Sequence, residues 1–573
     1  MPEHAQSLMS FMNTSESLLV HLRRAEHLKT SVLSCPFIDL SSRQLCDLEL
    51  LLNRAFYPLE GYLCQEDYES VLANMRLADG MLWPMPVTLD VPRCLAERCE
   101  PGTVVGLRDQ EGFLLAILHV ESVWRPDKRQ EALQVFGTDD PAKHPAVRYL
   151  YDRVDEWYLG GRVEGLHLPM HYDFPSLWMT PSMAHQQFAQ RGWRRVVGFQ
   201  ADTCLHCAHK EMILRASREV GASIFLHPLV GGFQTGKLDP ITQVRCYQAF
   251  AARFPDNMIA LGILPLAARW AGPREALWRA LIHKNYGCSH VMLSDCMADP
   301  GADGDQALYP RWAGYDLVAR HHEEIGIQPV RLKPMVYVEN RAQYIPADEV
   351  REDMDIREIS SQELQRRLEW GLDVPEWFSF PEVVQELRYA FPPRHKQGFT
   401  IFLTGFSGAG KSTLAKVLRK KFLEMRDRPV TLLDGDIVRR NLSSELDFSR
   451  EHREINVRRI GFVASEITKN GGIAICAPIA PFEDSRQYNR ELISRYGGYI
   501  EVYLSTPLEV CESRDRKGLY AKARKGMITG VTGIDDPYQP PVDPELTVDT
   551  SAVSPAEGAQ MVLLFLEEQG YIK

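Results

Sequence analysis

The chain has 573 residues, which is too long for a single hydrophobic core and predicts three or four domains. Its hydrophobic content of 45% and charged content of 25% are typical of a globular protein, and its net charge of −11 argues against a general nucleic-acid or membrane-surface binder. There is no apolar run near the ~20 residues of a membrane span and no signal-peptide pattern, and the 12 cysteines are spread along the chain. We therefore expect a cytoplasmic protein with reduced thiols, and neither nucleic acid nor membrane as a partner.

The first two predicted domains differ in their strand pattern. Residues 1–170 contain short strand-like runs broken by proline and glycine, such as Trp83–Asp90, and predict a β-rich domain. Residues 171–330 alternate apolar strands, such as Arg195–Phe199 and His290–Leu293, with helical patterns. This alternation indicates an α/β domain with a parallel sheet.

Two further segments follow. Residues 331–394 form a small third domain, which contains a charged helix at 361–370 and ends in a linker rich in proline. Residues 395–573 form the last domain, in which helices separate the strands. Its strands are predicted at 399–404, 430–434, 473–477 and 499–504.

The run from Gly405 to Ser412 fits the pattern G-x-x-x-x-G-K-[S/T] between a predicted strand and a predicted helix, which is the context of a phosphate-binding loop. Its glycines let backbone N–H groups approach phosphate oxygens, and the helix N-terminus adds positive potential. Lys411 can contact the β- and γ-phosphates, and Ser412 can ligate Mg²⁺. We predict an ATP site with Mg²⁺ as the cofactor. Its residues are Gly405, Ser407, Gly408, Ala409, Gly410, Lys411, Ser412 and Thr413.

The next strand ends at Asp434, and Asp436 follows it where ligands of α/β sheets bind. Such a carboxylate can orient Mg²⁺ or accept a proton from an attacking hydroxyl, although it can also simply cap the next helix. Arg453, Asn456 and Arg459 are spaced to share one side of a helix. They suit either an anionic second substrate or a solvated face.

Four runs in this domain closely resemble adenylylsulfate kinase: Asp434–Arg439, Phe448–Arg459, Lys517–Arg524 and Thr532–Tyr538. The resemblance covers nearly all of residues 395–573. It implies that the γ-phosphoryl group of MgATP passes to the 3′-hydroxyl of adenosine 5′-phosphosulfate (APS), which gives PAPS and ADP. It also implies a mobile lid over 514–538.

The resemblance assigns roles by position. It makes Lys411 and Asp436 catalytic, with Asp436 engaging the 3′-hydroxyl, and it packs Arg514 on the ATP adenine. It makes Phe448 the stacking residue for the APS adenine. The implied APS ligands are Asp436, Arg439, Phe448, Arg453, Asn456 and Lys517, and the implied lid residues are Lys522 and Arg524.

Three positions depart from the kinase pattern. Ala480 stands in place of a serine, Glu483 in place of an arginine, and Val531 in place of an aromatic residue beside the adenine. None of the three belongs to the phosphate-transfer residues. We therefore expect activity, with an altered KM for the substrates.

Residues 1 to about 390 resemble ATP sulfurylase, on runs such as Ala55–Gly61, Met75–Gly80, Ala271–Leu277 and Asn285–Cys288. That family joins ATP and sulfate into APS and pyrophosphate. The resemblance implies a β-barrel-like N-terminal domain, a Rossmann-like α/β nucleotide-binding domain and a small third domain. It also implies a homo-oligomer, since proteins of this architecture form hexamers through sulfurylase contacts.

Both catalytic signatures of that family are changed in this chain. Where the family has Q-T-R-N-P-x-H-x-x-H, Asp202 replaces the arginine and Thr203 the asparagine. Where the family has G-R-D-H-A-G-P-G, Asp295 replaces the arginine and Met297 the histidine. The degenerate site therefore comprises Gln200, Asp202, Thr203, His206, His209, Asp295 and Met297.

These replacements act through charge. Each arginine-to-aspartate change shifts the local charge by two units, so the two together shift it by four in a cleft that must hold sulfate and a triphosphate. A pair of unit charges about 4 Å apart is worth roughly 1 kcal/mol in water and roughly 4 kcal/mol at an effective dielectric constant of 20. Each 1.4 kcal/mol is about tenfold in rate. We therefore predict a sulfurylase scaffold that has no sulfurylase activity and serves assembly or regulation, unless nearby residues substitute in a differently aligned loop.

Four potential zinc ligands, Cys204, His206, Cys207 and His209, occur together in the sequence. They lie within six residues of one another, which is too tight to wrap one tetrahedral ion, so we expect no zinc. The small-molecule partners implied by the resemblance are ATP and APS. Two alternatives stay open: a bifunctional enzyme that makes APS and then phosphorylates it, and a regulatory module whose kinase half only binds nucleotide.

Overall fold

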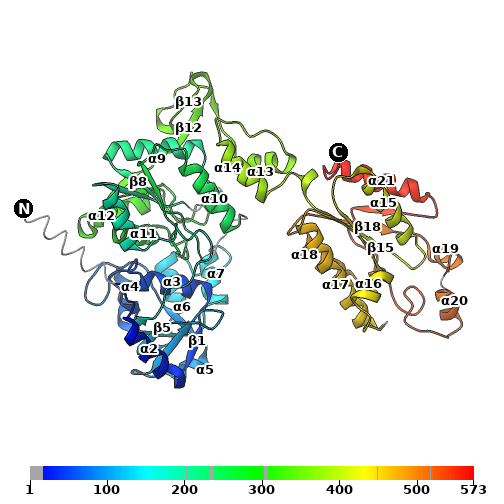
Figure 1. Ribbon diagram of the computed structural model, residues 1–573, viewed down its shortest axis with the longest axis horizontal. Helices are drawn as coiled ribbons and strands as arrows, with labels where there is room; N and C mark the ends of the chain where they lie inside the picture. The colour runs from blue at the N-terminus through cyan, green and yellow to red at the C-terminus, as the bar shows by residue number, and fades with distance from the viewer. Residues whose placement is uncertain (1–16, 202, 232–237, 302–306, 448, 517) are drawn as a thin grey trace, which may run out of the picture. The chain divides into compact units, whose positions relative to one another are not determined.

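The computed structural model describes residues 17–201, 203–231, 238–301, 307–447, 449–516 and 518–573. The chain forms two compact units (Figure 1). The N-terminal unit runs to Ile359 and includes Pro375–Ala390, and the C-terminal unit comprises Ser360–Val374 and Phe391–Lys573. Within the described residues, no helix combines the length and the apolar character needed to cross a membrane.

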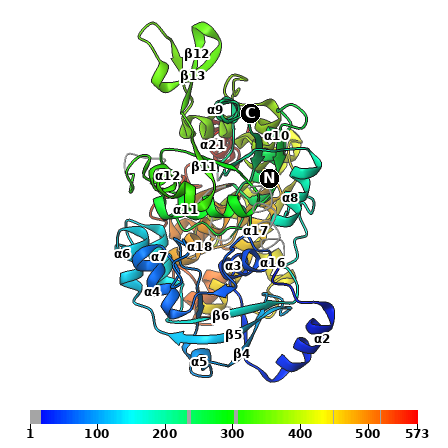
Figure 2. The same cartoon turned by 90° about the vertical axis from the view of Figure 1, so that its left-hand side faces the viewer.

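The N-terminal unit begins with a six-stranded sheet in the order β1-β4-β5-β6-β2, with β3 paired to β6. Strands β5 and β6 are long and antiparallel, and α3 lies above them in Figure 2. This arrangement confirms the predicted β-rich domain. The strands are β1 (Phe37–Asp39), β2 (Gly61–Tyr62), β3 (Leu89–Val91), β4 (Val104–Arg108), β5 (Leu114–Trp124) and β6 (Trp157–Gly165). The helices are α2 (Leu22–Ser31), α3 (Ser42–Leu52), α4 (Gln65–Asn74), α5 (Arg93–Ala96), α6 (Lys128–Phe136) and α7 (Pro145–Asp152).

A second sheet follows with the order β11-β10-β7-β8-β9, and every pair in it is parallel. This confirms the α/β domain predicted from alternating strands and helices. The strands are β7 (Val196–Phe199), β8 (Ser223–Leu226), β9 (Ile259–Leu261), β10 (His290–Leu293) and β11 (Gln328–Arg331). The helices are α8 (Pro181–Gln190), α9 (Cys207–Val220), α10 (Pro240–Ala251), α11 (Gly272–Asn285) and α12 (Ala313–Ile325).

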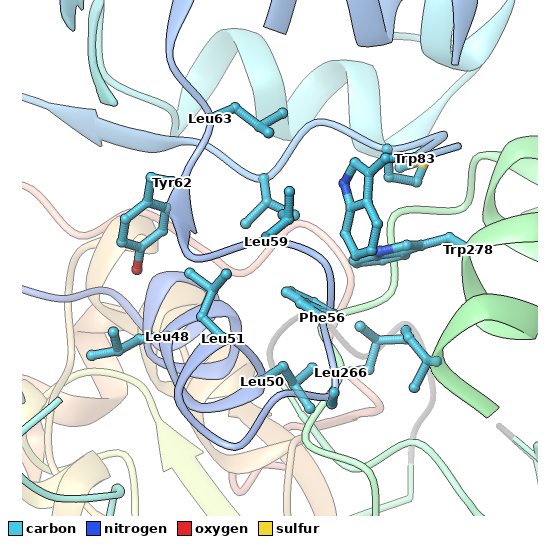
Figure 3. Packing of buried hydrophobic residues seen from close by; sticks show 14 of the residues in the cluster. Leu48, Leu50, Leu51, Phe56, Leu59, Tyr62, Leu63, Trp83, Leu266 and Trp278 are labelled. Carbon is cyan, nitrogen blue, oxygen red and sulfur yellow. The ribbon is translucent and has the colours of Figure 1, made fainter. Parts of the chain in front are cut away.

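One hydrophobic core joins these two domains (Figure 3). The Phe56 ring, which follows α3, lies 5.7 Å from the Trp83 ring and 5.1 Å from the Trp278 ring of α11. All three side chains are fully buried. Because aromatic side chains of this size bury much apolar area, their shared packing explains why the two domains form a single unit.

The segment predicted as one third domain, 331–394, is divided between the two units. Its small sheet of β12 (Met335–Val338), β13 (Gln343–Pro346) and β14 (Ile356–Arg357), together with α14 (Pro381–Ala390), belongs to the N-terminal unit. Helix α13 (Ser361–Trp370) belongs to the C-terminal unit. There the Arg394 guanidinium lies 5.3 Å from the Trp370 ring and 3.8 Å from the Glu369 carboxylate. Arg394 also donates to the Gln569 carbonyl oxygen at 3.2 Å, which connects α13 to the C-terminal residues of the chain.

The C-terminal unit is built on a parallel sheet in the order β16-β17-β15-β18-β19. The four predicted strands are confirmed, with β18 starting one residue early, while the short β19 was not predicted. The strands are β15 (Phe399–Thr404), β16 (Val430–Asp434), β17 (Ile473–Ala477), β18 (Gly498–Leu504) and β19 (Leu546–Val548). The helices are α15 (Lys411–Met425), α16 (Gly435–Asn441), α17 (Arg450–Lys469), α18 (Glu483–Ile493), α19 (Leu508–Ser513), α20 (Leu519–Arg524) and α21 (Pro555–Glu568).

Candidate active site

The loop between β15 and α15 contains glycines that no other residue could replace easily. Gly405, Gly408 and Gly410 have φ values of 144°, 81° and 96°. A Cβ at Gly405 would lie 2.6 Å from the Leu504 carbonyl oxygen, and one at Gly408 would lie 2.8 Å from that of Cys511. Helix α15 begins directly after this loop, so its N-terminal N–H groups favour an anion there.

Lys411 is buried beside this loop. Its Nζ donates hydrogen bonds to the carbonyl oxygens of Gly405 at 2.8 Å and Phe406 at 2.6 Å. The side chains of Ser412 and Thr413, in the first turn of α15, are exposed. The predicted phosphate ligands therefore lie together at the carboxyl end of β15. The Lys411 ammonium group is hydrogen-bonded to the loop that is predicted to bind the phosphates.

A polar network under the loop connects it to Arg514. The Ala409 carbonyl oxygen accepts a hydrogen bond from Thr550 Oγ1 at 3.0 Å, and Thr550 Oγ1 lies 2.9 Å from Thr506 Oγ1. Arg514 donates to Thr550 Oγ1 at 2.7 Å and to its carbonyl oxygen at 2.8 Å. Sequence reasoning placed Arg514 near ATP but missed both threonines. The two threonines follow the carboxyl ends of β18 and β19, where ligands of parallel sheets bind, and this position could have indicated them. Because β19 was not predicted, Thr550 could not be placed in this way.

Four of the predicted APS ligands lie on two helices, Asp436 and Arg439 on α16 and Arg453 and Asn456 on α17. Arg453 Nη1 lies 2.8 Å from Asp536 Oδ2 and donates to Thr532 Oγ1 at 3.1 Å. Asn456 is 5% exposed, and its side-chain oxygen has no hydrogen-bond partner among the described residues. Arg453 therefore contacts the segment predicted as the lid. On the same helix, the buried side-chain oxygen of Asn456 is an acceptor without a partner among the described residues.

Other predicted residues are placed differently. Arg439 donates to the Asp447 carbonyl oxygen at 3.2 Å. Arg459 pairs with Glu445 at 2.6 Å, which fits the solvated-face alternative for that side chain. Asp436 lies in α16, but its side chain falls outside the description of the structure. Phe448 and Lys517 lie outside the described residues.

The segment predicted as a lid reaches the phosphate-binding loop through Tyr520. The Tyr520 hydroxyl donates to the Ser407 carbonyl oxygen at 2.9 Å. On the same short helix, Lys522 is exposed, and Arg524 pairs with Glu512 at 2.7 Å. The Tyr520 hydrogen bond thus connects α20 to the phosphate-binding loop. The two basic side chains of α20 do not share this contact, because Lys522 is exposed and Arg524 pairs with Glu512.

The three departures from the kinase pattern are accommodated within the fold. Ala480 is buried at φ 48°, and its carbonyl oxygen accepts from Arg486 Nη1 at 2.7 Å. Glu483 forms an ion pair with the same arginine, and Val531 is buried in the hydrophobic core. Ala480 and Glu483 thus contact one arginine after β17, whereas Val531 contributes to the core.

In the N-terminal unit, Gln200 directly follows β7. It is 6% exposed, and neither of its amide atoms has a hydrogen-bond partner among the described residues. Thr203 is exposed, and its carbonyl oxygen accepts from the Tyr247 hydroxyl at 2.9 Å. Asp202 lies outside the described residues.

His206 and His209 lie at the start of α9. His209 Nδ1 accepts a hydrogen bond from the His206 backbone N–H at 3.0 Å, and His206 Nδ1 lies 2.8 Å from Ser379 Oγ. Burial lowers the pKa of His206 to about 3 and that of His209 to about 4. Both rings are therefore neutral at pH 7 and supply no positive charge to an anion. Across the described ranges, no group of three or more His, Cys, Asp or Glu side chains is placed to hold a metal ion.

The second degenerate signature follows β10. The Asp295 carboxylate lies 3.6 Å from Arg311 Nε, although the Arg311 side chain is 82% exposed. Met297 packs against the hydrophobic core. Asp299 is buried and accepts backbone hydrogen bonds from Gly301 at 2.8 Å and Tyr309 at 3.0 Å. Asp299 thus connects Gly301 to Tyr309, while Asp295 and Met297 stand at the positions of the family's arginine and histidine.

The domains match three known sequence families in chain order. Residues 13–168 match the PUA-like domain, residues 175–390 match ATP-sulfurylase, and residues 397–549 match adenylylsulphate kinase. The sulfate adenylyltransferases of Neosartorya fischeri and Aspergillus fumigatus are each 45% identical over 553 residues, which is 96% of this chain and 96% of theirs. A solved hexameric APS kinase from Thiobacillus denitrificans is 40% identical with a TM-score of 0.78, and the match covers 97% of both chains.

Proposed function

The chain belongs to the sulfate adenylyltransferase family, with an adenylylsulfate kinase domain after its ATP-sulfurylase domain, and we propose that only the kinase domain retains its chemistry. The protein is an adenylylsulfate kinase. The proposed reaction transfers the γ-phosphoryl group of ATP to the 3′-hydroxyl of APS and yields PAPS and ADP. The observation that carries the proposal is the contrast between the buried Lys411 beside its glycine loop and the aspartates, Asp202 and Asp295, at the two arginine positions of the sulfurylase signatures.

In the proposed mechanism, the loop of Gly405–Gly410 binds the β- and γ-phosphates through its backbone and the N-terminus of α15. Lys411 exchanges its two carbonyl acceptors for phosphate oxygens and stabilises the charge of the transferring group. The exposed hydroxyl of Ser412 fits Mg²⁺, which neutralises phosphate charge when it is bound with ATP.

For the second substrate, Arg453 and Asn456 bind APS, and Asp436 orients or deprotonates the 3′-hydroxyl. The partly buried ion pair of Arg453 with Asp536 keeps the guanidinium in one orientation before the substrate arrives. The lid residues Lys522 and Arg524 then lie on α20, which Tyr520 ties to the phosphate-binding loop.

We propose that the sulfurylase-like domain makes no APS and instead supports assembly. Asp202 and Asp295 replace the two arginines, and the neutral His206 and His209 do not compensate for them. The matched Thiobacillus denitrificans protein is described as a hexameric APS kinase and aligns along both domains. This likeness supports a homo-oligomer, in which the inactive domain would act as a scaffold.

The test runs the sulfurylase reaction backwards, from APS and pyrophosphate to ATP, with luminescence as the readout. It should be done in the Lys411→Ala background, because an active kinase would consume the ATP with the remaining APS. We expect no ATP, and no rescue by Asp202→Arg or Asp295→Arg alone, since each leaves the other aspartate facing the anions. ATP formation that His206→Ala abolishes would overturn the proposal and establish a bifunctional enzyme.

A further inference from the structure

Thr550, which follows β19, forms hydrogen bonds with three residues at the phosphate-binding loop. Its Oγ1 donates to the Ala409 carbonyl oxygen at 3.0 Å, accepts from Arg514 Nη1 at 2.7 Å and lies 2.9 Å from Thr506 Oγ1. Its carbonyl oxygen accepts from Arg514 Nη2 at 2.8 Å, and its backbone N–H donates to Thr506 Oγ1 at 3.2 Å. The proposed mechanism gives this residue no role so far.

The direction of each hydrogen bond at the Thr550 hydroxyl follows from its partners. A threonine hydroxyl has one proton to donate and two lone pairs with which to accept. The Ala409 carbonyl oxygen can only accept this proton, and the Arg514 guanidinium can only donate. Thr506 therefore donates to the second lone pair, because its other acceptor, the Ala409 carbonyl oxygen, is farther away at 3.4 Å. All three positions of the Thr550 hydroxyl are used within the protein, which is typical of a positioning group and not of a substrate ligand.

The bond to the Ala409 carbonyl group also orients the next backbone N–H. The peptide bond between Ala409 and Gly410 is trans and planar, so the Gly410 N–H points away from the oxygen that Thr550 binds. Gly410 is the N-cap residue of α15, and its N–H therefore lies beside the N-terminal N–H groups that favour an anion. Thr550 also packs closely here, since a Cβ on Gly410 would lie 3.3 Å from its Oγ1.

The same threonine orients Arg514. Two nitrogen atoms of one guanidinium donate to two oxygen atoms of Thr550, at 2.7 and 2.8 Å. Because guanidinium N–H groups lie in one plane, these two bonds restrict the tilt of that plane and leave its flat faces for stacking. Arg514 is accessible to a ligand, since it lines a cavity of about 380 Å³ together with residues of α20. A guanidinium face held in this way suits a planar aromatic ring such as a nucleobase.

We propose that Thr550 is a positioning residue of the ATP site, whose hydroxyl aligns the phosphate-binding loop and Arg514 with each other. The inference rests on the proposed function, because it takes the loop and Arg514 as the two ends of one ATP site. One hydroxyl group then couples recognition of the triphosphate to recognition of the base. Its loss should weaken the binding of both parts of the nucleotide, although Thr550 contacts neither.

The test measures ligand binding, which requires no phosphoryl transfer. A non-hydrolysable ATP analogue and inorganic tripolyphosphate, each with Mg²⁺, are titrated calorimetrically into the full chain. The analogue has a base, whereas tripolyphosphate has only the phosphates, so the ratio of the two Kd values measures the contribution of the base. Tripolyphosphate binding that Lys411→Ala removes is binding at the loop. A wild-type protein that binds neither probe would overturn the proposed function as well, whereas wild-type binding without the variant effects below would overturn this inference alone.

Two substitutions at Thr550 separate the hydroxyl from the rest of the side chain. Thr550→Val keeps the shape and removes the hydroxyl, so it should raise the Kd of the ATP analogue about 10–100-fold and that of tripolyphosphate roughly 3–10-fold. Thr550→Ser keeps the hydroxyl, and both Kd values should stay within about threefold of wild type. Equal losses in the two variants, or wild-type affinity for tripolyphosphate in Thr550→Val, would contradict the proposal.

Arg514→Ala tests the other end of the site. It should weaken the ATP analogue and leave the affinity for tripolyphosphate unchanged, since it removes only the contact to the base. In the double variant with Thr550→Val, the loss for the analogue should be smaller than the product of the two single losses, because residues that share a hydrogen bond act together. Fully multiplicative losses would show that Thr550 does not act through Arg514.

The matched control is Thr547→Val, because Thr547 is an exposed residue of β19 and should be replaceable without effect on either Kd. A thermal melt of each variant checks the fold. If Thr550→Val is unfolded, the smaller Thr550→Ala takes its place with the same expected losses. Wild-type affinity for both probes in folded Thr550→Ala would then overturn the proposal.

Discussion

Two parallel five-stranded sheets in this chain present loops at the carboxyl ends of their strands, but those loops differ in charge. After β15, a glycine loop carries the buried ammonium group of Lys411. In the segments that follow β7 and β10, the sequence has Asp202 and Asp295 at the arginine positions, and burial keeps His206 and His209 neutral. The strands beneath are apolar and buried in both sheets. Apolar packing maintains each sheet independently of its loops, so one scaffold can lose the charges for its chemistry and still fold.

The largest effect in the kinase site is expected from Asp436→Asn. If this carboxylate accepts the proton of the attacking hydroxyl, kcat should fall about 10²–10⁴-fold while the KM for ATP changes little. Steady-state ADP formation with varied ATP and APS measures both, and the exposed Asp427→Asn is the matched control. A variant that keeps its kcat would rule out a proton-accepting role for Asp436.

Lys411→Ala should lower kcat about 10²–10³-fold, because it removes the cation that stabilises the transferring phosphoryl group. The readout is ADP formation in the presence of APS, together with a thermal melt. Lys416→Ala, which changes an exposed lysine on the same helix, should have near-normal turnover. Near-normal turnover in folded Lys411→Ala would show that the contrast in charge between the two sheets does not determine activity.

Arg453→Ala should raise the KM for APS about 10–100-fold, which corresponds to the loss of a hydrogen bond to a charged group. The KM for ATP should be nearly unchanged, because Arg453 pairs with Asp536 and not with the phosphate-binding loop. Arg458→Ala, an exposed neighbour on α17, serves as the control. An equal rise in both KM values would indicate general disruption of α17 and no specific role in APS binding.

Acid should destabilise the N-terminal unit before the C-terminal one. Of the 17 histidines in the sequence, only His395 and His452 belong to the C-terminal unit. His206 has a folded pKa of about 3, below the unfolded value of about 6.5, so protonation favours unfolding. The neutral His206 therefore contributes fully to the free energy of unfolding above about pH 6.5, and this contribution is lost as the pH falls toward 3.

At pH 5 this one histidine should cost about 2 kcal/mol of unfolding free energy, relative to neutral pH. Urea unfolding at pH 7.5 and pH 5.0, followed by hydrogen exchange in each unit, measures the difference. His206→Gln should reduce the pH dependence, since glutamine does not titrate. The expectation fails if both units lose equal stability, or if the variant retains the full pH dependence.

Local patterns in the sequence predicted much of the kinase domain. The phosphate-binding loop was recognised because its glycines, Lys411 and Ser412 are contiguous and the chemistry restricts each residue type. The strands at 399–404, 430–434 and 473–477 were predicted with their observed bounds, because buried parallel strands are continuous apolar runs. The short β19 was missed, since three residues carry too little pattern to distinguish a strand from a loop.

Contacts between distant residues were not predictable in the same way. Thr506 and Thr550 meet beneath the phosphate-binding loop, although they are 44 residues apart. Arg453 pairs with Asp536, and helix α13 joins the C-terminal unit although a segment of the other unit follows it in the chain. Short-range patterns record backbone preferences and contiguous motifs, whereas these features arise from packing between segments that the chain order does not relate.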